Sequence, residues 1–303
     1  MLKPDQEIVQ NCLAASDCRE LRSAVASALA DAGIEDGRLE AQLLICDAFD
    51  VSRAAVIAGI VDIQDPAKRD GLALMLLSRL SRRPLAYIRG YKEFYGLAYR
   101  VSPHTLIPRP ETELIVDFVR SIYSKLSSSG SPVLIDVGTG TGCIPVSSLV
   151  HCSRLSAVGI DISAEALHVA RQNGRDHGVQ DRVRWLQSDL LEAITGMADL
   201  IVSNPPYISK SEIPLLAPEV RAHEPILALD GGEDGLDPYR RLIPSAIRVL
   251  KPGGYLAVEC GIGQAQILSE MLRSSEFDEV DCLKDLAGID RVVIGRRSTG
   301  SAI

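Results

Sequence analysis

The tetrapeptide Asn204-Pro205-Pro206-Tyr207 constrains the fold of this chain more than any other segment. It follows the apolar run 198–203, which is typical of a buried parallel strand. Neither proline has an N–H for the strand ladder, so the chain must leave the sheet at the carboxyl end of this strand. Open α/β sheets bind their ligands at that edge. The side-chain amide, the free carbonyls and the ring could hold a planar NH2 group, so the segment predicts a site for an amide or an exocyclic amine.

A glycine-rich turn upstream predicts a second ligand-binding segment. The apolar strand 133–137 runs into the turn 138–142, and an apolar helix pattern follows. Glycines allow positive φ and let a ligand approach the backbone. The spacing is Asp-x-Gly-x-Gly-x-Gly, with Asp136 on the strand, so it is neither the Rossmann Gly-x-Gly-x-x-Gly nor a P-loop. The pattern indicates a nucleotide-like ligand that carries a positive charge.

Polar side chains follow the next strands as well. Asp161 ends the strand 156–160 about 20 residues beyond the glycines, where an acidic residue typically accepts hydrogen bonds from ribose hydroxyls. Asp189 follows the strand 182–186, where a carboxylate could meet adenine. Any one of these Asp residues is equally well explained as a helix N-cap or a turn residue. Four consecutive strand–helix units that each place a polar group at the same sheet edge favour a ligand site.

The chain divides into a helical region and an α/β region. Residues 1–85 are predicted to form a small helical domain, 86–108 a β-hairpin linker and 109–303 the sheet with its helices. Asp17 and Glu20 predict a helix start, because they form a capping-box-like pair before an apolar stripe. Three stripes at helical spacing are expected to pack in the helical core: Leu21, Val25 and Leu29; Leu39, Leu43 and Cys46; and Leu72, Leu76 and Leu80.

The end of the chain predicts the edge of the sheet. A helix is predicted at 237–250, before the segment Pro252-Gly253-Gly254, and a strand is predicted after that segment, at 255–260. A helix at 264–274 follows. Two closing strands, near Val280 and at 291–294, predict an antiparallel edge.

Composition excludes several classes of protein. The chain has 303 residues, a net charge of −8 and a pI of about 5.2, so it lacks the excess of basic residues that drives non-specific nucleic-acid binding. An acidic chain suits a basic protein partner. No apolar run reaches about 18 residues, so no membrane span is expected. Seven cysteines without a Cys-x-x-Cys pair predict a cytoplasmic protein with reduced thiols, and five histidines without ligand spacing predict no metal site.

The chain resembles the HemK/PrmC family of protein-(glutamine-N5) methyltransferases, which act on peptide chain release factors. The most specific part of the resemblance is the segment 107–113, Ile-Pro-Arg-Pro-Glu-Thr-Glu. The resemblance implies a class I S-adenosylmethionine-dependent methyltransferase fold, which is a Rossmann-like α/β fold with a seven-stranded sheet. It also implies that the small N-terminal helical domain recognises the protein substrate. The matching segments are residues 94–97, 106–113, 136–143, 161–163, 203–208, 224–237, 252–254 and 285–291.

Carried over position by position, the resemblance implies the residues of the site. Some relatives have Trp where this chain has Leu190, so adenine is expected to pack on an aliphatic surface here. The catalytic residues would be Asn204, Pro205 and Tyr207, and the target glutamine of a Gly-Gly-Gln motif would also contact Pro206, Arg109 and Glu111. The cofactor S-adenosyl-L-methionine, which leaves as S-adenosyl-L-homocysteine, would contact Gly138, Thr139, Gly140, Thr141, Gly142, Asp161, Asp189, Leu190 and Asn204.

The Asn-Pro-Pro-Tyr motif leaves two other functions open. DNA adenine-N6 methyltransferases share the motif, but the acidic pI and the lack of a target-recognition region count against that function. A non-catalytic S-adenosylmethionine-binding module is the other, and the intact glycines, Asp161 and Asn204 argue against it. In the favoured function, Asn204 and Pro205 accept both N–H bonds of the glutamine amide and hold its nitrogen in line with the sulfonium methyl group. Asn204 could instead be an Asx-turn residue, which the two following prolines make a weaker interpretation.

Overall fold

The computed structural model describes residues 4–128 and 130–299 and contains two compact units. The first unit comprises Met1–Gly90 together with Pro218–His223. The second comprises Tyr91–Ala217 and Glu224–Ile303. Each unit has a hydrophobic core of its own, so each is described by itself.

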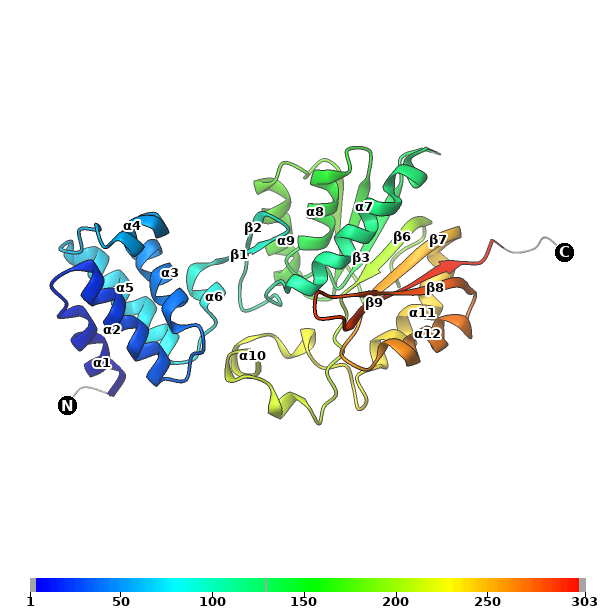
Figure 1. The fold of residues 1–303 in the computed structure, drawn as a ribbon. Helices are drawn as coiled ribbons and strands as arrows, with labels where there is room; N and C mark the ends of the chain where they lie inside the picture. The colour runs from blue at the N-terminus through cyan, green and yellow to red at the C-terminus, as the bar shows by residue number, and fades with distance from the viewer. Residues whose placement is uncertain (1–3, 129, 300–303) are drawn as a thin grey trace. The chain divides into compact units, whose positions relative to one another are not determined.

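The first unit is entirely helical in its described residues. Its second helix begins where the capping pair predicts, because the Asp17 carboxylate accepts the backbone N–H groups of Arg19 and Glu20. Asp65 caps the fifth helix in the same way, and Pro66 follows at its first position. The helices are α1 (Pro4–Leu13), α2 (Cys18–Asp31), α3 (Gly37–Phe49), α4 (Arg53–Ala58), α5 (Pro66–Leu80), α6 (Leu85–Arg89) and α10 (Pro218–His223), which are labelled in Figure 1.

Helix α3 buries a different face from the predicted one. The expected stripe of Leu39, Leu43 and Cys46 is wrong, because Leu39 is 37% exposed and the other two are only partly buried. The helix carries apolar residues on neighbouring positions around its axis, so periodicity alone does not select a face. The residues that it buries completely or nearly so are Ala41, Leu44, Ile45 and Phe49.

A buried ion-pair network holds α10 within the helical unit. The Arg79 side chain is only 5% exposed, and it contacts Glu40 at 2.6 Å and Glu219 at 3.1 Å. Arg82 contacts the same Glu219 carboxylate at 3.0 Å. A buried guanidinium needs such partners, because an unpaired charge is expensive to remove from water.

The second unit contains the predicted seven-stranded sheet. Its strand order is β5-β4-β3-β6-β7-β9-β8. The first five strands in this order are parallel, and β9 is antiparallel to both of its neighbours. The strands are β3 (Val133–Val137), β4 (Ser156–Asp161), β5 (Val183–Gln187), β6 (Ala198–Ser203), β7 (Leu250–Glu259), β8 (Phe277–Lys284) and β9 (Asp290–Arg297). The strands β1 (Tyr91–Phe94) and β2 (Leu97–Arg100) form a separate antiparallel hairpin.

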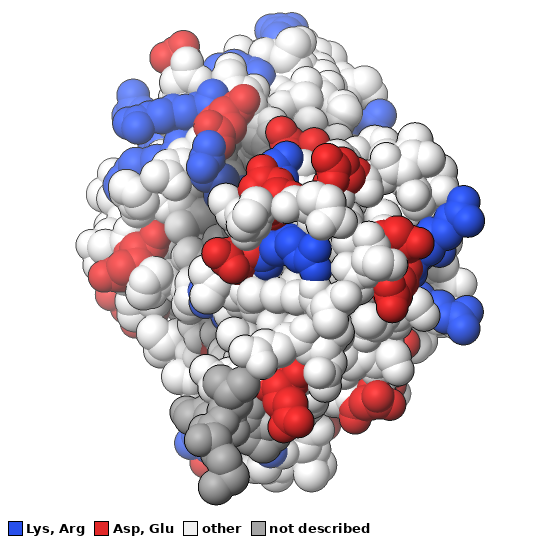
Figure 2. Space-filling model, turned by 90° about the vertical axis from the view of Figure 1, so that its left-hand side faces the viewer, with Lys and Arg blue, Asp and Glu red and all other residues white. Residues whose placement is uncertain are grey.

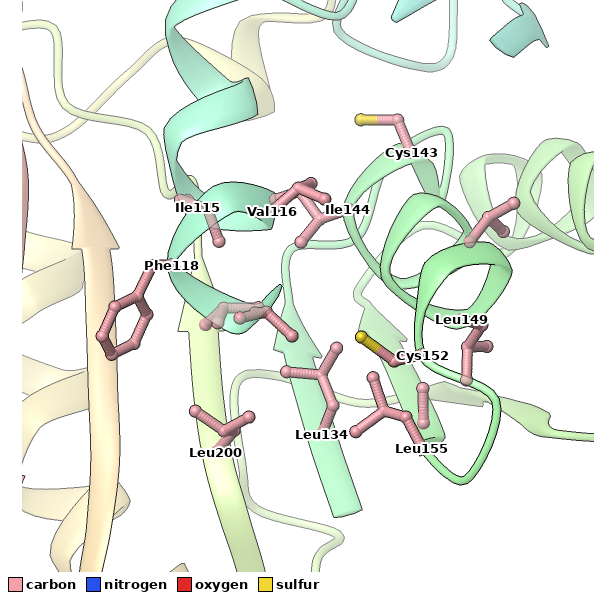
Figure 3. Packing of buried hydrophobic residues seen from close by; sticks show 14 of the residues in the cluster. Ile115, Val116, Phe118, Leu134, Cys143, Ile144, Leu149, Cys152, Leu155 and Leu200 are labelled. Atoms are coloured by element: carbon pink, nitrogen blue, oxygen red, sulfur yellow. The ribbon is translucent and has the colours of Figure 1, made fainter. Parts of the chain in front are cut away.

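Two layers of helices cover this sheet, because alternate residues of its strands face opposite sides. Leu134 and Leu200 face one core, and their neighbours Ile135 and Ile201 face the other. Figure 3 shows the first core, in which side chains of α7 and α8 meet Leu134 and Leu200. The helices are α7 (Glu113–Ser127), α8 (Cys143–His151) and α9 (Ala164–Asp176), with α11 (Asp237–Val249) and α12 (Ala265–Arg273) on the second core; the 3-10 turn η1 (Pro110–Thr112) precedes α7.

Strand β7 begins earlier than predicted. The Pro252-Gly253-Gly254 segment, expected to precede the strand, lies within Leu250–Glu259. Ala198 pairs with Leu250, whereas Leu200 pairs with Tyr255, so the intervening residues bulge out of the ladder. Gly253 supplies the positive φ of 78° that this bulge requires. Strand pairing therefore continues on both sides of this segment.

Among residues 4–128 and 130–299, no helix combines the length and the apolar character needed to cross a membrane.

Candidate active site

A cavity of about 820 Å³ opens at the carboxyl ends of β3, β4, β5 and β6. This is the edge at which the sequence placed its polar residues. The cavity lies entirely within the second unit. Of the predicted site residues it is lined by Gly138, Thr139, Gly140, Thr141, Asp161, Asp189, Leu190, Asn204, Pro206 and Arg109.

The glycine-rich turn is folded against the end of β4. The Ile160 carbonyl accepts the N–H groups of Gly138 and Thr139 at 2.9 and 2.8 Å. Asp161 Oδ2 accepts the Gly140 N–H at 2.8 Å. Gly138 has a φ of 73°, and a Cβ there would meet no protein atom closer than the Asn204 carbonyl oxygen at 3.9 Å. The backbone of this turn is therefore bare on the cavity side, which lets a ligand approach it closely.

Gly142, predicted to bind the cofactor, lies against Trp185 and does not line the cavity. A Cβ on Gly142 would lie 2.8 Å from the indole ring. A Cβ on Gly159 would lie 2.4 Å from it, and a Cβ on Gly174 would lie 3.3 Å from it. Trp185 thus rests on three glycines from β4, α9 and the start of α8. A side chain at position 142 is therefore excluded by packing against Trp185, and not by a bound ligand.

Asp136 is a fully buried carboxylate behind the turn. Thr139 Oγ1 donates to its Oδ2 at 2.5 Å, whereas its Oδ1 has no partner among the described residues. Burial raises the pKa of Asp136 to about 7, against the opposing effect of the Thr139 hydrogen bond. A cationic ligand nearby would favour the ionised form.

The acidic residues at the next two strand ends have partners within the protein. Asp161 accepts the Gly140 N–H with one oxygen and the Ser163 N–H, at 2.9 Å, with the other. Burial nevertheless raises its pKa. Asp189 forms an ion pair with Arg241 of α11 at 2.7 Å. Leu190 lines the cavity with a left-handed φ of 47°, a conformation that bulky residues rarely adopt.

The Asn204 side chain has a defined direction. Its Nδ2 donates to the Thr112 hydroxyl at 3.1 Å. No donor in the described part of the chain hydrogen-bonds to its Oδ1 or to the Pro205 carbonyl oxygen. Asn204 lines the cavity, and Pro205 is the buried residue between the lining residues Asn204 and Pro206. Two oxygens that can accept N–H bonds therefore remain available in this turn.

A second glycine-rich segment clamps the Asn-Pro-Pro-Tyr turn. Ile208 and Asp230 form an isolated parallel bridge. A Cβ on Gly235 would lie 2.3 Å from the Tyr207 carbonyl oxygen, so a side chain at this position would displace the turn. The same carbonyl accepts the Gln264 side-chain amide at 3.0 Å. These contacts explain why the segment 229–237 is rich in glycine: the turn packs directly on its backbone.

Three predicted residues remain to be described: Arg109, Glu111 and Tyr207. Arg109 lines the cavity and binds Glu224 at 2.6 Å, and the side chain of Glu224 is only 1% exposed. Glu111 and Tyr207 do not line it, and Tyr207 is instead surrounded by the charges of Glu259, Arg109, Arg291 and Glu111. Burial raises the pKa of Tyr207, so its hydroxyl keeps its proton and is unsuited to act as a base.

Two residues beside Asn204 are not among the predicted site residues. The first, Thr112, lies within the Ile-Pro-Arg-Pro-Glu-Thr-Glu segment. Glu259 ends β7, the strand that pairs with β6 before Asn204. The rule that polar residues gather at the carboxyl ends of adjacent parallel strands would have found Glu259. Among the described residues, no group of three or more His, Cys, Asp and Glu side chains is arranged to hold a metal ion.

Comparisons with known proteins match most of the chain. The family model described as the PrmC N-terminal domain matches residues 20–90, and the one described as the methyltransferase small domain matches residues 118–219. The release factor glutamine methyltransferase of Bradyrhizobium diazoefficiens is 40% identical over 277 residues, which are 91% of this chain and 93% of that protein. The chain belongs to the release factor glutamine methyltransferase family. The family member from Moorella thermoacetica is 38% identical over 91% of this chain and 98% of its own length.

Solved structures share the fold at lower identity. The hMettl16 catalytic domain, in complex with a MAT2A 3'UTR hairpin, superposes with a TM-score of 0.55 at 16% identity. That match covers 77% of this chain and 84% of the other. A methyltransferase from Pyrococcus furiosus has a TM-score of 0.50 at 19% identity, over 68% of this chain and 92% of the other. These likenesses confirm the predicted class I methyltransferase fold.

Proposed function

We propose that this chain methylates the side-chain amide nitrogen, N5, of the glutamine in the Gly-Gly-Gln motif of peptide chain release factors. The methyl donor is S-adenosyl-L-methionine and the product is S-adenosyl-L-homocysteine. Relatives that match nearly the whole chain are named release factor glutamine methyltransferases. The observation that carries the proposal is the Asn204 amide, whose nitrogen is engaged by Thr112 while its oxygen is left to accept a substrate N–H.

The residues around the cavity fit S-adenosylmethionine. Gly138 and Gly140 present bare backbone, and Asp136 has an unpartnered buried oxygen behind them that favours a cation nearby. Asp161 and Leu190 line the cavity further along the sheet edge, where ribose and adenine would bind. When bound, the cofactor supplies an electrophilic methyl group on a positively charged sulfur.

The substrate amide is a weak nucleophile, because its nitrogen lone pair is delocalised into the carbonyl. Asn204 Oδ1 and the Pro205 carbonyl oxygen accept its two N–H bonds, which hold the nitrogen in line with the methyl group. As positive charge builds on the nitrogen, the same two acceptors stabilise it more strongly. The proton becomes very acidic after transfer and leaves to water. Tyr207 forms a wall of the turn and takes no proton.

The helical unit is proposed to recognise the release factor. The PrmC N-terminal domain model covers most of it, and the cavity residues all belong to the other unit. Nucleic acid is not proposed as a substrate, since the chain has a net charge of −8. On the face shown in Figure 2, basic residues lie in small groups beside acidic ones and form no continuous strip.

The proposed location is the cytoplasm. All seven cysteines are free thiols, and five of them are buried. Such a set is typical of a reducing compartment.

A labelling experiment tests the proposed function. The full chain is incubated with methyl-labelled S-adenosylmethionine and, separately, with a release factor, the same factor with Ala in place of the Gly-Gly-Gln glutamine, a ribosomal protein and duplex DNA. We expect label only in the unaltered release factor, with one methyl group on the glutamine by peptide mass spectrometry. The Asn204→Ala variant is the control for transfer at this site. Label in DNA or in the Ala-substituted factor would contradict the proposal.

A further inference from the structure

Glu259 is a buried carboxylate that the proposed reaction does not yet use. It is the last residue of β7 and is only 2% exposed. Its backbone is held by the β9 ladder through Val292 and by the Tyr239 hydroxyl, which donates to its carbonyl at 2.7 Å. Glu259 does not line the cavity, so it acts on the site only through its neighbours.

Those neighbours are Thr112 and Asn204. Hydrogen bonds from both side chains lower the pKa of the Glu259 carboxyl, so both are donated to its ionised form. Its Oε2 has no hydrogen-bond partner among the described residues. Asn204 Nδ2 donates to the Thr112 hydroxyl oxygen at 3.1 Å, which leaves the single Thr112 hydrogen to be donated to the neighbouring Glu259 carboxylate. The three side chains form a chain of hydrogen bonds with one direction.

This direction decides which end of the Asn204 amide faces the substrate. An ionised carboxylate only accepts hydrogen bonds, so it keeps Nδ2 on the side of Glu259 and Thr112. Oδ1 is then turned to the cavity side, where it can accept a substrate N–H. A protonated carboxyl could donate to Oδ1 instead. The amide would then turn over and present its NH2 group to the NH2 group of the substrate, two donors that repel each other.

We infer that Glu259, together with Thr112, is a positioning residue that fixes the Asn204 amide with its oxygen toward the target glutamine. The inference rests on the proposed function. The backbone at Glu259 is anchored independently of its side chain, so a change confined to the carboxyl group acts on Asn204 rather than on the strand.

The role implies a pH dependence with a definite sign. Burial, with a smaller contribution from Glu111, raises the pKa of Glu259 to about 7 against the opposing effects of Thr112, Arg291 and Asn204. The ionised form is the one that orients Asn204, so turnover should fall as the pH drops through about 7. The charged or titratable groups around the carboxyl are Glu111 before α7, Cys143 of α8, Tyr207 after β6, Tyr239 of α11, Arg291 of β9 and the adjacent Cys260.

The test compares the full-length chain with the isosteric variant Glu259→Gln. Methyl transfer to the release factor is measured from pH 5.5 to 9 at saturating substrates, and S-adenosylhomocysteine affinity is measured by calorimetry. We expect kcat to fall roughly tenfold or more. This fall should be smaller than that of Asn204→Ala, for which a loss of about 10²-fold or greater is expected. The acid limb near pH 7 should disappear, and cofactor affinity should stay within about twofold. Asp136→Asn, which alters the other carboxyl with a pKa of about 7, should keep the acid limb of kcat.

Two further comparisons separate positioning from other roles. Thr112→Val removes the hydroxyl at nearly constant shape, whereas Thr112→Ser keeps it, so kcat should fall more in the valine variant. In an Asn204→Ala background, Glu259→Gln should cause no further loss, because the group that it orients is absent. An equal loss with and without Asn204 would overturn the inference, since the carboxylate would then act on the reaction directly. An unchanged pH profile in Glu259→Gln would also overturn it.

These outcomes are distinct from failure of the proposed function. If the unaltered chain does not methylate the release factor, the proposed function fails. If it does, and Glu259→Gln has the same kcat and pH profile, only the positioning role fails. Should Glu259→Gln not fold, which calorimetry of cofactor binding would reveal, the two Thr112 variants decide the question.

Discussion

Replacing Gly142 by alanine should destabilise the protein through two separate costs. The residue has a φ of 76°, and placing an L side chain in this left-handed region costs about 1–2 kcal/mol. The new Cβ would also lie 2.8 Å from the Trp185 ring and 3.2 Å from the Ala170 Cβ, an overpacking that costs about 1–3 kcal/mol. Together these costs reach roughly 2–5 kcal/mol, which for a unit of this size corresponds to a fall in Tm of about 4–20 °C.

Gly159→Ala is the matched control, because it creates a clash with the same ring without a positive φ. Its Cβ would lie 2.4 Å from Trp185. In a Trp185→Leu background the clash with the ring is removed and the Cβ at position 159 keeps the 3.0 Å approach to Thr139 Oγ1, so Gly159→Ala should recover most of its lost stability relative to Trp185→Leu alone. Gly142→Ala should recover only part of it and keep a deficit of about 1–2 kcal/mol.

Urea unfolding followed by circular dichroism measures these differences, and S-adenosylhomocysteine affinity reports whether the glycine turn is intact. Equal recovery of both alanine variants would show that the left-handed backbone at Gly142 contributes nothing. A Gly159→Ala variant as stable as the unaltered chain would refute the packing of Trp185 on its three glycines.

Four further results are expected. Asp161→Ala should weaken cofactor binding by about 10- to 150-fold in calorimetry, because ribose hydroxyls and the Gly140 N–H lose a charged acceptor worth roughly 1.5–3 kcal/mol; unchanged affinity would remove Asp161 from the site. Asn204→Ala should lower methyl transfer by roughly 10²-fold or more with cofactor binding intact, and Asn204→Asp should retain measurable activity. Arg109→Met should lower the unfolding free energy by about 2–3 kcal/mol, since it leaves the buried Glu224 carboxylate without its charged partner and with the Ile107 N–H as donor, and Glu224→Gln should restore part of the loss. Asp136→Asn should reduce a loss of stability between about pH 4 and 7: the unfolded carboxyl releases its proton first, whereas the folded one keeps it up to a pKa of about 7, so the Tm of the unaltered chain should fall more steeply over that range than the Tm of the variant.

The architecture could be predicted because it depends on local rules. The double proline of Asn204-Pro205-Pro206-Tyr207 forces an exit at a strand end, and parallel strands bring such exits to one edge. The capping residue Asp17 acts within one turn of its own helix. The antiparallel partners of β7 at the edge of the sheet were likewise visible as alternating segments at the end of the chain.

The sequence is less informative for residues whose surroundings are set by neighbours distant in the chain. The face that α3 buries depends on the helices packed against it, because its sequence offers more than one apolar face. Gly142 is kept small by Trp185, a residue of another strand, although its place in the turn suggested contact with a ligand. Glu259 lies inside the predicted strand 255–260, whereas β7 ends at this residue and its pairing with β6 brings it beside Asn204. Such relations follow from topology and not from spacing.

Because α10 belongs to the helical unit, that unit is encoded by two separate stretches of the gene. Arg79 shares its buried guanidinium between Glu40, from the first 90 residues, and Glu219, which is encoded more than a hundred codons later. A recombination that exchanged only the N-terminal region between two family members would separate Arg79 from one of its two carboxylates. Successful exchange therefore requires two inherited pieces, and changes at Arg79 or Arg82 should be accompanied by changes at position 219 across the family.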